Sequence, residues 1–281
     1  MLSVPEQLTV LYVFVADFLQ QHPALAQWRH SNHSPKLTDA EVITSALMQG
    51  YFNCFNCPTL KRTYLLVIAN DPRAFPALCS YKQWVARLQA VTPVVGRLIE
   101  SDPASVAETD GFYLIDSEPI PLCHPVRHGR VRNLREDGAW FGKTKKGWFF
   151  GFKLHLLVAG RGLILAAILT PGNWDDRDPV CALLQATEVG GACLGDLGDR
   201  GPALQDELWT DMEVLLLARA DAEREQQALL SSVREPIETT FSQLWTRFAT
   251  RSYARSWNGL WTALKLKMLE LNLCHAGIVS Y

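Results

Sequence analysis

The sequence predicts an α/β protein in which a helical region precedes a mixed sheet with helices on its faces. In the first hundred residues, apolar residues recur at three- and four-residue spacing, which indicates helices. After Pro103, short apolar runs bounded by turn residues appear, which indicates strands. Those runs then alternate with helical patterns, an order typical of an α/β sheet. We therefore predict a helical domain over residues 1–105 and an α/β domain over residues 106–281.

Four helices are predicted in the first region, over residues 6–21, 39–51, 60–69 and 81–100. Thr38 and Glu41 have the spacing of a capping box, which fixes the start of the second helix. A helical domain of this size either binds the ends of the DNA element or has only a structural role in packing. The sequence leaves both open, because no helix rich in Arg, Asn or Gln stands out.

Three antiparallel strands followed by an α-β-α-β-α order are predicted in the second region. The strands cover residues 111–115, 148–158 and 163–169, and the last two form a hairpin. A helix, strand, helix and strand then follow over residues 179–187, 192–195, 203–209 and 213–218. Two closing helices are predicted over residues 232–248 and 257–274.

Three acidic residues on three different elements are the strongest chemical signal. Asp116 and Asp196 each end an apolar run, and Glu238 lies inside the pattern of a closing helix. Such a set suits a cage for divalent metals, since hard cations take oxygen ligands. Asp199 is the alternative to Asp196, although it also suits the N-cap of the next helix. Glu118, on the same strand face as Asp116, is a candidate auxiliary ligand, although we expect Pro119 to end that strand.

The segments around these acids resemble the DDE transposases of the insertion-sequence 982 family. The resemblance rests on segments in the family's order, at residues 36–44, 80–84, 114–120, 151–156, 195–198 and 234–244. It implies a ribonuclease-H-like catalytic domain in which Asp116, Asp196 and Glu238 are the catalytic residues and hold two Mg²⁺ or Mn²⁺ ions. It also implies double-stranded DNA partners, both terminal inverted repeats and target DNA, and a homodimer on DNA. Leu197 and Asp199 depart from the family's pattern of a basic residue and a tyrosine near the second aspartate.

Basic segments flank the predicted site even though the formal net charge is −2. Residues 127–161 carry nine basic residues against two acids, whereas residues 175–225 carry thirteen acids against four bases. A polarised surface of this kind favours DNA binding, and a pair of solvated faces is the alternative. The candidate DNA-binding residues are Lys143, Lys145, Lys146, Lys153, His155, Arg234, Arg247, Arg251 and Arg255.

Two further features carry open alternatives. Asp175 and Asp176 either resemble the family's Asn-x-x-Asp turn or form an ordinary turn and helix cap. Trp140 and Phe141 either stack on an unpaired base or cover the core.

Composition excludes several classes of protein. With 48% hydrophobic and 20% charged residues the chain is globular, and its apolar stretches are too short to span a membrane. No signal peptide is evident, so we expect a cytoplasmic, nucleoid-associated protein. Seven unevenly spaced cysteines favour reduced thiols. Cys54 and Cys57 have no second pair downstream to complete a zinc site.

The predicted function is therefore a metal-dependent DNA transposase that cleaves transposon ends and joins them to target DNA. A catalytically inactive, transposase-derived DNA-binding protein is the alternative, although none of the three acids is missing. A glycoside hydrolase with a carboxylate pair would leave the third acid and the basic segments unused.

Overall fold

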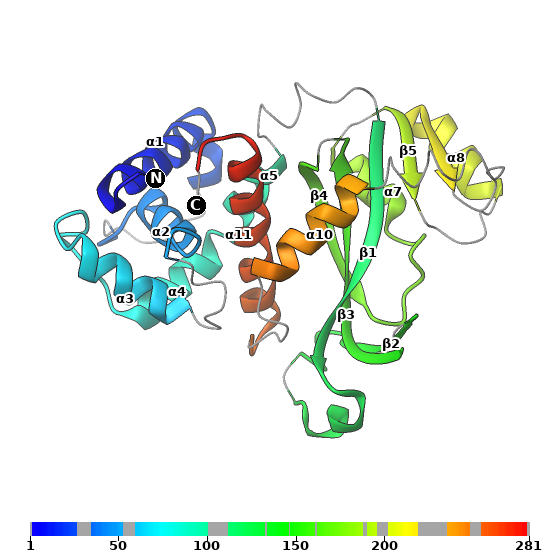
Figure 1. Cartoon of the computed structure of the whole chain (residues 1–281), viewed down its shortest axis with the longest axis horizontal. Helices are drawn as coiled ribbons and strands as arrows, with labels where there is room; N and C mark the ends of the chain where they lie inside the picture. The colour runs from blue at the N-terminus through cyan, green and yellow to red at the C-terminus, as the bar shows by residue number, and fades with distance from the viewer. Residues whose placement is uncertain are drawn as a thin grey trace. The chain divides into compact units, whose positions relative to one another are not determined.

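The computed structural model consists of two compact units, a helical one and one built on a sheet (Figure 1). The first contains residues 1–98 and 246–281, and the second residues 99–245. The structure describes residues 2–26, 35–52, 60–100, 112–132, 134–145, 147–160, 162–187, 190–195, 202–218, 235–247 and 254–279.

The helical unit is built around α2, which packs against its neighbours in sequence and against the C-terminal helix α11. Trp84 is fully buried and donates from Nε1 to Ser45 Oγ at 2.9 Å, and Arg87 pairs with Asp39 at 2.7 Å. Thr92 and Thr262 share a buried hydrogen bond of 2.6 Å. The described elements of this unit are α1 (Val4–Gln21), η1 (Pro23–Ala26), α2 (Asp39–Leu47), α3 (Leu60–Asn70), α4 (Tyr81–Ala90), α5 (Thr92–Glu100) and α11 (Trp257–His275).

The predicted helices are present, with two differences. The capping box of α2 is confirmed, since Thr38 accepts from the Glu41 amide and Glu41 accepts from the Thr38 amide. The helix predicted over residues 81–100 is two helices, α4 and α5. Pro93 lacks an amide hydrogen and fits only in the first turn of a helix, so a single helix does not run through it. The helix predicted over residues 39–51 ends at Leu47.

The sheet unit contains a six-stranded mixed sheet in which β2, β3, β1, β5 and β6 follow one another and β4 also pairs with β3. Pairing of β1 with β3 is antiparallel, and pairing of β1 with β5 and of β5 with β6 is parallel. The described elements are β1 (Phe112–Cys123), η3 (Pro125–Arg130), β2 (Trp140–Thr144), β3 (Gly147–Ala159), β4 (Ile164–Pro171), α7 (Val180–Gln185), β5 (Gly191–Gly195), α8 (Pro202–Met212), β6 (Val214–Ala218) and α10 (Glu235–Arg247).

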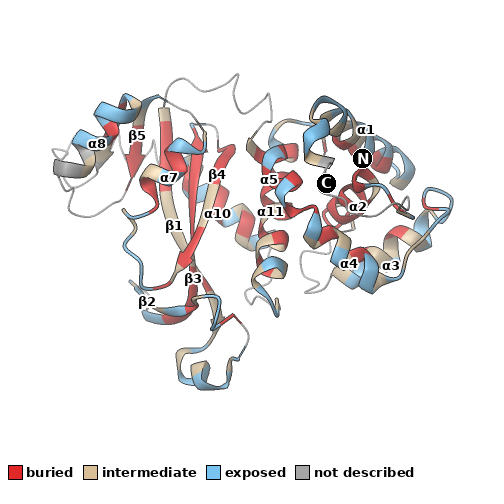
Figure 2. Ribbon diagram, turned by 180° about the vertical axis from the view of Figure 1, so that it is seen from behind, coloured by how far each residue is buried: buried red, intermediate tan, exposed pale blue. Residues whose placement is uncertain are grey.

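This architecture confirms the predicted α/β class and is compatible with a ribonuclease-H-like fold. Helices α7 and α10 cover opposite faces of the sheet, and the central strands are buried between them (Figure 2). On the α7 side, Tyr113, Ile115 and Leu157 pack in one apolar core with Val180 and Leu208 of α7 and α8. The hairpin of β3 and β4 is confirmed as an antiparallel pair.

Strand β1 is longer than predicted and does not stop at Pro119. It pairs with β3 through Pro121 and Cys123, whereas its pairing with β5 ends at Ile115. A proline is tolerated in a strand where its missing amide hydrogen would point away from the paired neighbour. Asp116 therefore lies within a strand, at the position where β5 stops.

Strand β2 was not predicted, because residues 127–147 have the composition of a basic loop. It pairs with the first half of β3, from Gly147 to Gly151, and β4 pairs with the second half, from Phe152 onward. Because β1 occupies the other edge of β3, β2 and β4 follow one another along the same edge. The basic segment is thus a hairpin built onto the sheet.

Helix α11 packs with α2 and α4 in the helical unit, whereas the sequence grouped residues 257–274 with the sheet. The domain boundary between residues 105 and 106 stays a prediction. None of the helices in the described part of the chain has the length and apolar content to cross a membrane. The five cysteines that the structure describes are free thiols, and Cys54 and Cys57 lie outside the described residues.

Candidate active site

Asp116 is set into the sheet at the junction of β1, β3 and β5. Its Cα pairs with Leu156 of β3, and the preceding residue, Ile115, forms the last parallel pair with Gly195 of β5. The carboxylate is half-buried, and its Oδ1 accepts a hydrogen bond of 2.8 Å from the Ser117 amide. Since Ile115 faces the α7 core and side chains alternate along a strand, Asp116 faces the α10 side.

Helix α10 carries Glu238 in its first turn, and its other face fixes it to the sheet. Ile237, Phe241 and Leu244 are buried, as expected from their spacing. Thr240 is fully buried and donates from Oγ1 to the carbonyl oxygen of Gly162 at 3.0 Å. Glu238 lies at the margin of this buried stripe and is exposed. The helix therefore presents a carboxylate on the same side of the sheet as Asp116.

Of the remaining predicted acids, Glu118 lies in β1 two residues after Asp116, and the other two lie outside the described residues. Asp196 and Asp199 follow β5, whose last described residue, Gly195, pairs with Ile115. Within the described part of the chain, no group of three His, Cys, Asp or Glu side chains is close enough to hold a metal ion. The donor set of Asp116, Glu238 and Asp196 is nevertheless all oxygen, which fits a hard divalent cation such as Mg²⁺ in its chemistry.

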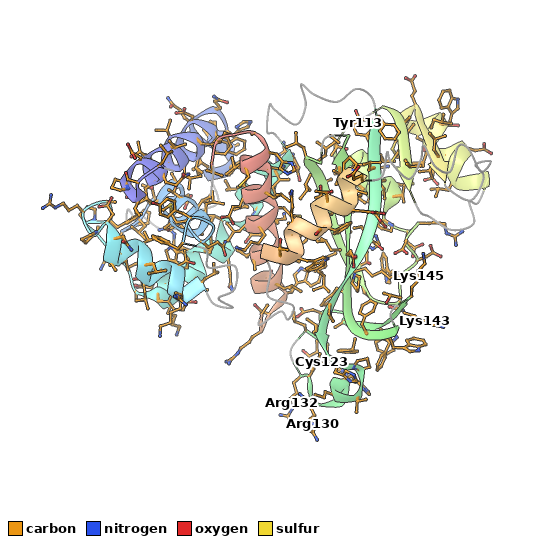
Figure 3. All side chains as sticks on the ribbon, in the orientation of Figure 1. Tyr113, Cys123, Arg130, Arg132, Lys143 and Lys145 are labelled. Carbon is orange, nitrogen blue, oxygen red and sulfur yellow. The ribbon has the colours of Figure 1, made fainter. Side chains whose placement is uncertain are left out.

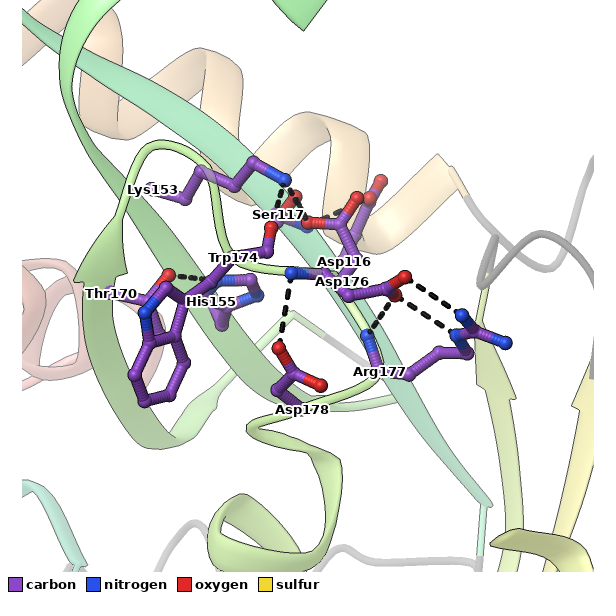
Figure 4. A network of polar contacts seen from close by, with 10 residues as sticks. Asp116, Ser117, Lys153, His155, Thr170, Trp174, Asp176, Arg177 and Asp178 are labelled. Carbon is purple, nitrogen blue, oxygen red and sulfur yellow. Dashed lines mark hydrogen bonds and ion pairs between the residues drawn. The ribbon is translucent and has the colours of Figure 1, made fainter. Parts of the chain in front are cut away.

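A polar network lies on the opposite face of β1 and β3, behind Asp116 (Figure 4). Ser117 donates from Oγ to Asp176 Oδ1 at 2.8 Å, and Lys153 donates from Nζ to the same oxygen at 3.0 Å. Lys153 also donates to the carbonyl oxygen of Trp174 at 2.8 Å. The side chain of Lys153 is 14% exposed and that of Asp176 is 42% exposed. Lys153 therefore has two partners within the protein.

His155 is a buried, neutral histidine in this network. Its Nε2 is 2.8 Å from Thr170 Oγ1, and the residue is 1% exposed. Burial lowers the pKa of His155 to about 4, with Asp176 and Asp178 opposing and Lys153 assisting the change. The imidazole is thus uncharged near pH 7.

The turn after β4 brings Asp176 to the network, and the sequence left open whether it is a family-like turn or an ordinary turn with a helix cap. The turn begins at Gly172, whose amide donates to the carbonyl of Gly151 at 3.1 Å. A Cβ on Gly172 would lie 2.7 Å from the Trp140 carbonyl, so only glycine allows this close approach. Asp175 pairs with Arg177 at 2.8 Å, and that guanidinium lowers the pKa of Asp175 to about 2. The sequence indicated the turn but not the hydrogen bond that Ser117 donates to Asp176.

The hairpin of β2 and β3 carries the basic residues that the sequence assigned to a loop. Lys143 and Lys145 are exposed, and Lys143 Nζ lies 5.8 Å from the centre of the Trp148 ring. Arg130 and Arg132 gather on the same half of the unit, toward Cys123 rather than Tyr113 (Figure 3). A basic surface thus extends along the distal end of β1 and the hairpin.

The two aromatic residues of β2 have different surroundings. Phe141 packs edge-on against Phe150 and against His128, so it covers the core of the hairpin. Trp140 is 54% exposed, and Trp148 is 61% exposed. Among the described aromatic residues of this hairpin, the two tryptophans are therefore the ones most accessible to a ligand.

The other basic candidates are only partly described. Arg255 is exposed just before α11, and Arg247 is the last residue of α10. Lys146, Arg234 and Arg251 lie outside the described residues.

A family model and a curated protein each match part of the chain. A family model described as "Transposase DDE domain" matches residues 106–249, just over half of the chain and a range that includes all three candidate acids. A curated protein, the 2-C-methyl-D-erythritol 2,4-cyclodiphosphate synthase of Salinibacter ruber (strain DSM 13855 / M31), is 36% identical over 84 residues. This match covers 28% of the chain and 53% of the curated protein, so the chain spans about half the length of that relative. No solved structure matches.

Proposed function

Because the chain belongs to the Transposase DDE domain family, we propose that it is a DNA transposase, of the insertion-sequence 982 type, that cleaves transposon ends and joins them to target DNA. The observation that carries the proposal is the register of β1 and β5. The last parallel pair joins Ile115 and Gly195, and an aspartate follows each of these residues in the sequence. Two aspartates that directly follow the last pair of two neighbouring parallel strands support a shared site.

The proposed catalytic residues are Asp116, Asp196 and Glu238, which would hold two Mg²⁺ or Mn²⁺ ions. When bound, such a pair activates the attacking oxygen and stabilises the leaving oxygen of a phosphoryl transfer. The chain's own part is to fix the three carboxylates. Asp116 is held by the sheet and by the Ser117 amide, and Glu238 by the packing of α10.

DNA binding is proposed for the basic residues around the site. Lys143, Lys145 and Arg255 are exposed, which supports contacts with phosphates. Lys146, Arg234, Arg247 and Arg251 are proposed on sequence grounds alone. Lys153 and His155 form hydrogen bonds with Asp176 and Thr170. We therefore propose that they stabilise the site from the opposite face of the sheet and do not contact DNA. The DNA would carry terminal inverted repeats, and a homodimer would bring two ends together.

The decisive test compares Asp116→Asn and Glu238→Gln with the wild type in cleavage of a labelled duplex that carries terminal inverted repeats. Each substitution removes one metal-binding charge and keeps the side-chain shape, so cleavage should fall to background while end binding persists. Glu235→Gln is the matched control, because Glu235 is also exposed in the first turn of α10. Full cleavage by either variant in Mg²⁺ would refute the carboxylate site. A wild type that binds ends but never cleaves them would favour the inactive DNA-binding alternative.

A further inference from the structure

We propose that Asp176 is a positioning residue for Asp116 and acts on it through Ser117. This inference rests on the proposed function, since it concerns the same carboxylate site. Asp176 lies 59 residues from Ser117 in the chain, in the turn between β4 and α7, yet its Oδ1 accepts the Ser117 hydroxyl at 2.8 Å. Ser117 in turn donates its amide hydrogen to Asp116 Oδ1 at 2.8 Å. One residue thus joins the two carboxylates.

The geometry explains why the link runs through the backbone. Side chains alternate along β1, so Ser117 points to the α7 face and Asp116 to the α10 face. Asp176 therefore fixes the hydroxyl of Ser117 on one face. The peptide of the same residue orients the carboxylate on the other face. A partner behind a metal ligand acts in this way when it holds the ligand's orientation before the metal binds.

Lys153 neutralises the negative charge of the Asp176 carboxylate next to Ser117. Its ammonium group bonds to Asp176 Oδ1 at 3.0 Å and to the Trp174 carbonyl at 2.8 Å, so it ties the turn to β3. Without that ammonium group, Asp176 would add an unpaired negative charge beside Ser117, the residue next to Asp116. The pair of Lys153 and Asp176 thus supplies a hydrogen-bond acceptor for Ser117 at little net charge.

Asp178 provides a matched control within the same turn. Its Oδ2 accepts the backbone amide of Asp175 at 3.1 Å, and this bond does not involve Ser117 or Lys153. Substitution of Asp178 by Asn therefore changes the charge of the turn by the same amount and leaves the link to Asp116 in place.

The experiment uses the full chain and measures Mn²⁺ affinity by calorimetry together with duplex cleavage. Asp176→Ala removes the acceptor and the charge, Asp176→Asn keeps an acceptor oxygen, and Ser117→Ala removes the donor. We expect Asp176→Ala and Ser117→Ala each to weaken Mn²⁺ binding by roughly 10- to 100-fold, the range seen for partners behind metal ligands. Asp176→Asn should lose less, Ser117→Thr should restore binding because it keeps the hydroxyl, and Asp178→Asn should match the wild type.

The double variant Ser117→Ala with Asp176→Ala separates positioning from general damage. If the two residues act through one bond, the double variant should bind Mn²⁺ about as weakly as the worse single variant. Multiplied losses, or wild-type Mn²⁺ affinity in Asp176→Ala, would overturn the inference. Thermal unfolding of each variant identifies losses of Mn²⁺ affinity that come from misfolding. Asp176→Asn keeps the shape of the side chain at a partly exposed position, so we expect this variant to fold.

Failure of the proposed function gives a different result. If Asp116→Asn binds Mn²⁺ as tightly as the wild type, the carboxylate site itself is refuted, and this inference with it. If Asp116→Asn loses Mn²⁺ binding and Asp176→Ala retains it, the site stands and only the positioning role falls.

Discussion

His155 shows how a single buried residue couples stability to pH. Its imidazole projects from β3, is buried and forms a hydrogen bond with Thr170. The pKa of His155 in the folded chain is about 4, below the ordinary value of 6.5. Between these values the unfolded chain binds a proton that the folded chain does not. The contribution of His155 to stability is therefore complete above about pH 7 and is lost as pH falls from about 6.5 toward 4.

We predict that the free energy of unfolding falls by roughly 2 kcal/mol between about pH 7 and about pH 5 because of His155. Asp176 and Asp178 limit the loss, since they favour the protonated ring, and Lys153 increases it. Urea unfolding at the two pH values measures the change. His155→Gln keeps a partner for Thr170 without titrating, so its stability should vary much less. An equal pH dependence in the variant would show that other groups are responsible.

The choice between Asp196 and Asp199 is a second question at the level of single residues. Asp196 directly follows β5, and Asp199 comes three residues later, before α8. We predict that Asp196→Asn abolishes Mg²⁺-dependent cleavage and that Asp199→Asn largely retains it. The reason is that Asp196 directly follows the residue of β5 that pairs with Ile115, whereas Asp199 lies close to the start of α8. The two variants are compared on the same labelled duplex. An active Asp196→Asn beside an inactive Asp199→Asn would reverse the assignment.

At the level of elements, α10 has one buried face that packs on the sheet and carries the exposed Glu238 beside that face. Its apolar residues recur at the spacing of one helical face, and Thr240 adds a specific bond to the turn between β3 and β4. Thr240 Oγ1 also lies 2.8 Å from the Pro236 carbonyl, one turn earlier in the helix. The helix is therefore fixed to the sheet at one defined point close to Glu238.

We predict that Thr240→Val destabilises the protein by about 1–2 kcal/mol, because the buried carbonyl of Gly162 loses its partner while the side-chain volume is kept. Cleavage should fall several-fold at the same time, since Glu238 is carried by the same helix. Urea unfolding and duplex cleavage measure the two effects. Thr240→Ser keeps the hydroxyl and should restore both. Normal cleavage by a destabilised Thr240→Val would mean that the position of α10 does not control the site.

At the level of the whole molecule, charge distribution matters more than net charge. The formal net charge is −2, yet Lys143 and Lys145 project from the hairpin of β2 and β3, and Arg130 and Arg132 lie on the same half of the sheet unit (Figure 3). A local basic surface can bind phosphates even when the chain as a whole is slightly acidic.

We predict that neutralising Lys143, Lys145 and Lys146 together flattens the dependence of log affinity on log salt by up to roughly three units of slope, one for each phosphate contact. Affinity for specific and random duplexes should fall alike, since phosphates carry no sequence information. Titration against a labelled duplex at several salt concentrations measures the slope. An unchanged slope would exclude this hairpin and leave Arg247, Arg251 and Arg255 as the stronger candidates.

The sequence by itself determined most of the elements, because their signals are local. Apolar spacing and the capping box at Thr38 fixed helices in the first unit, and the runs before Asp116 and Asp196 fixed the strands. The α/β class was also predictable from these patterns. The three candidate acids were chosen because each stands next to or within such a pattern, and their roles stay predictions.

Only the tertiary structure decided how distant segments meet. It extended β1 past Pro119, paired the unpredicted β2 with β3, and packed α11 with α2 and α4. It also joined Ser117 to Asp176 across 59 residues. Local periodicity gives the face of a strand or helix but not its partner. That partner is chosen by the burial and hydrogen bonds of the whole chain, which no single segment contains.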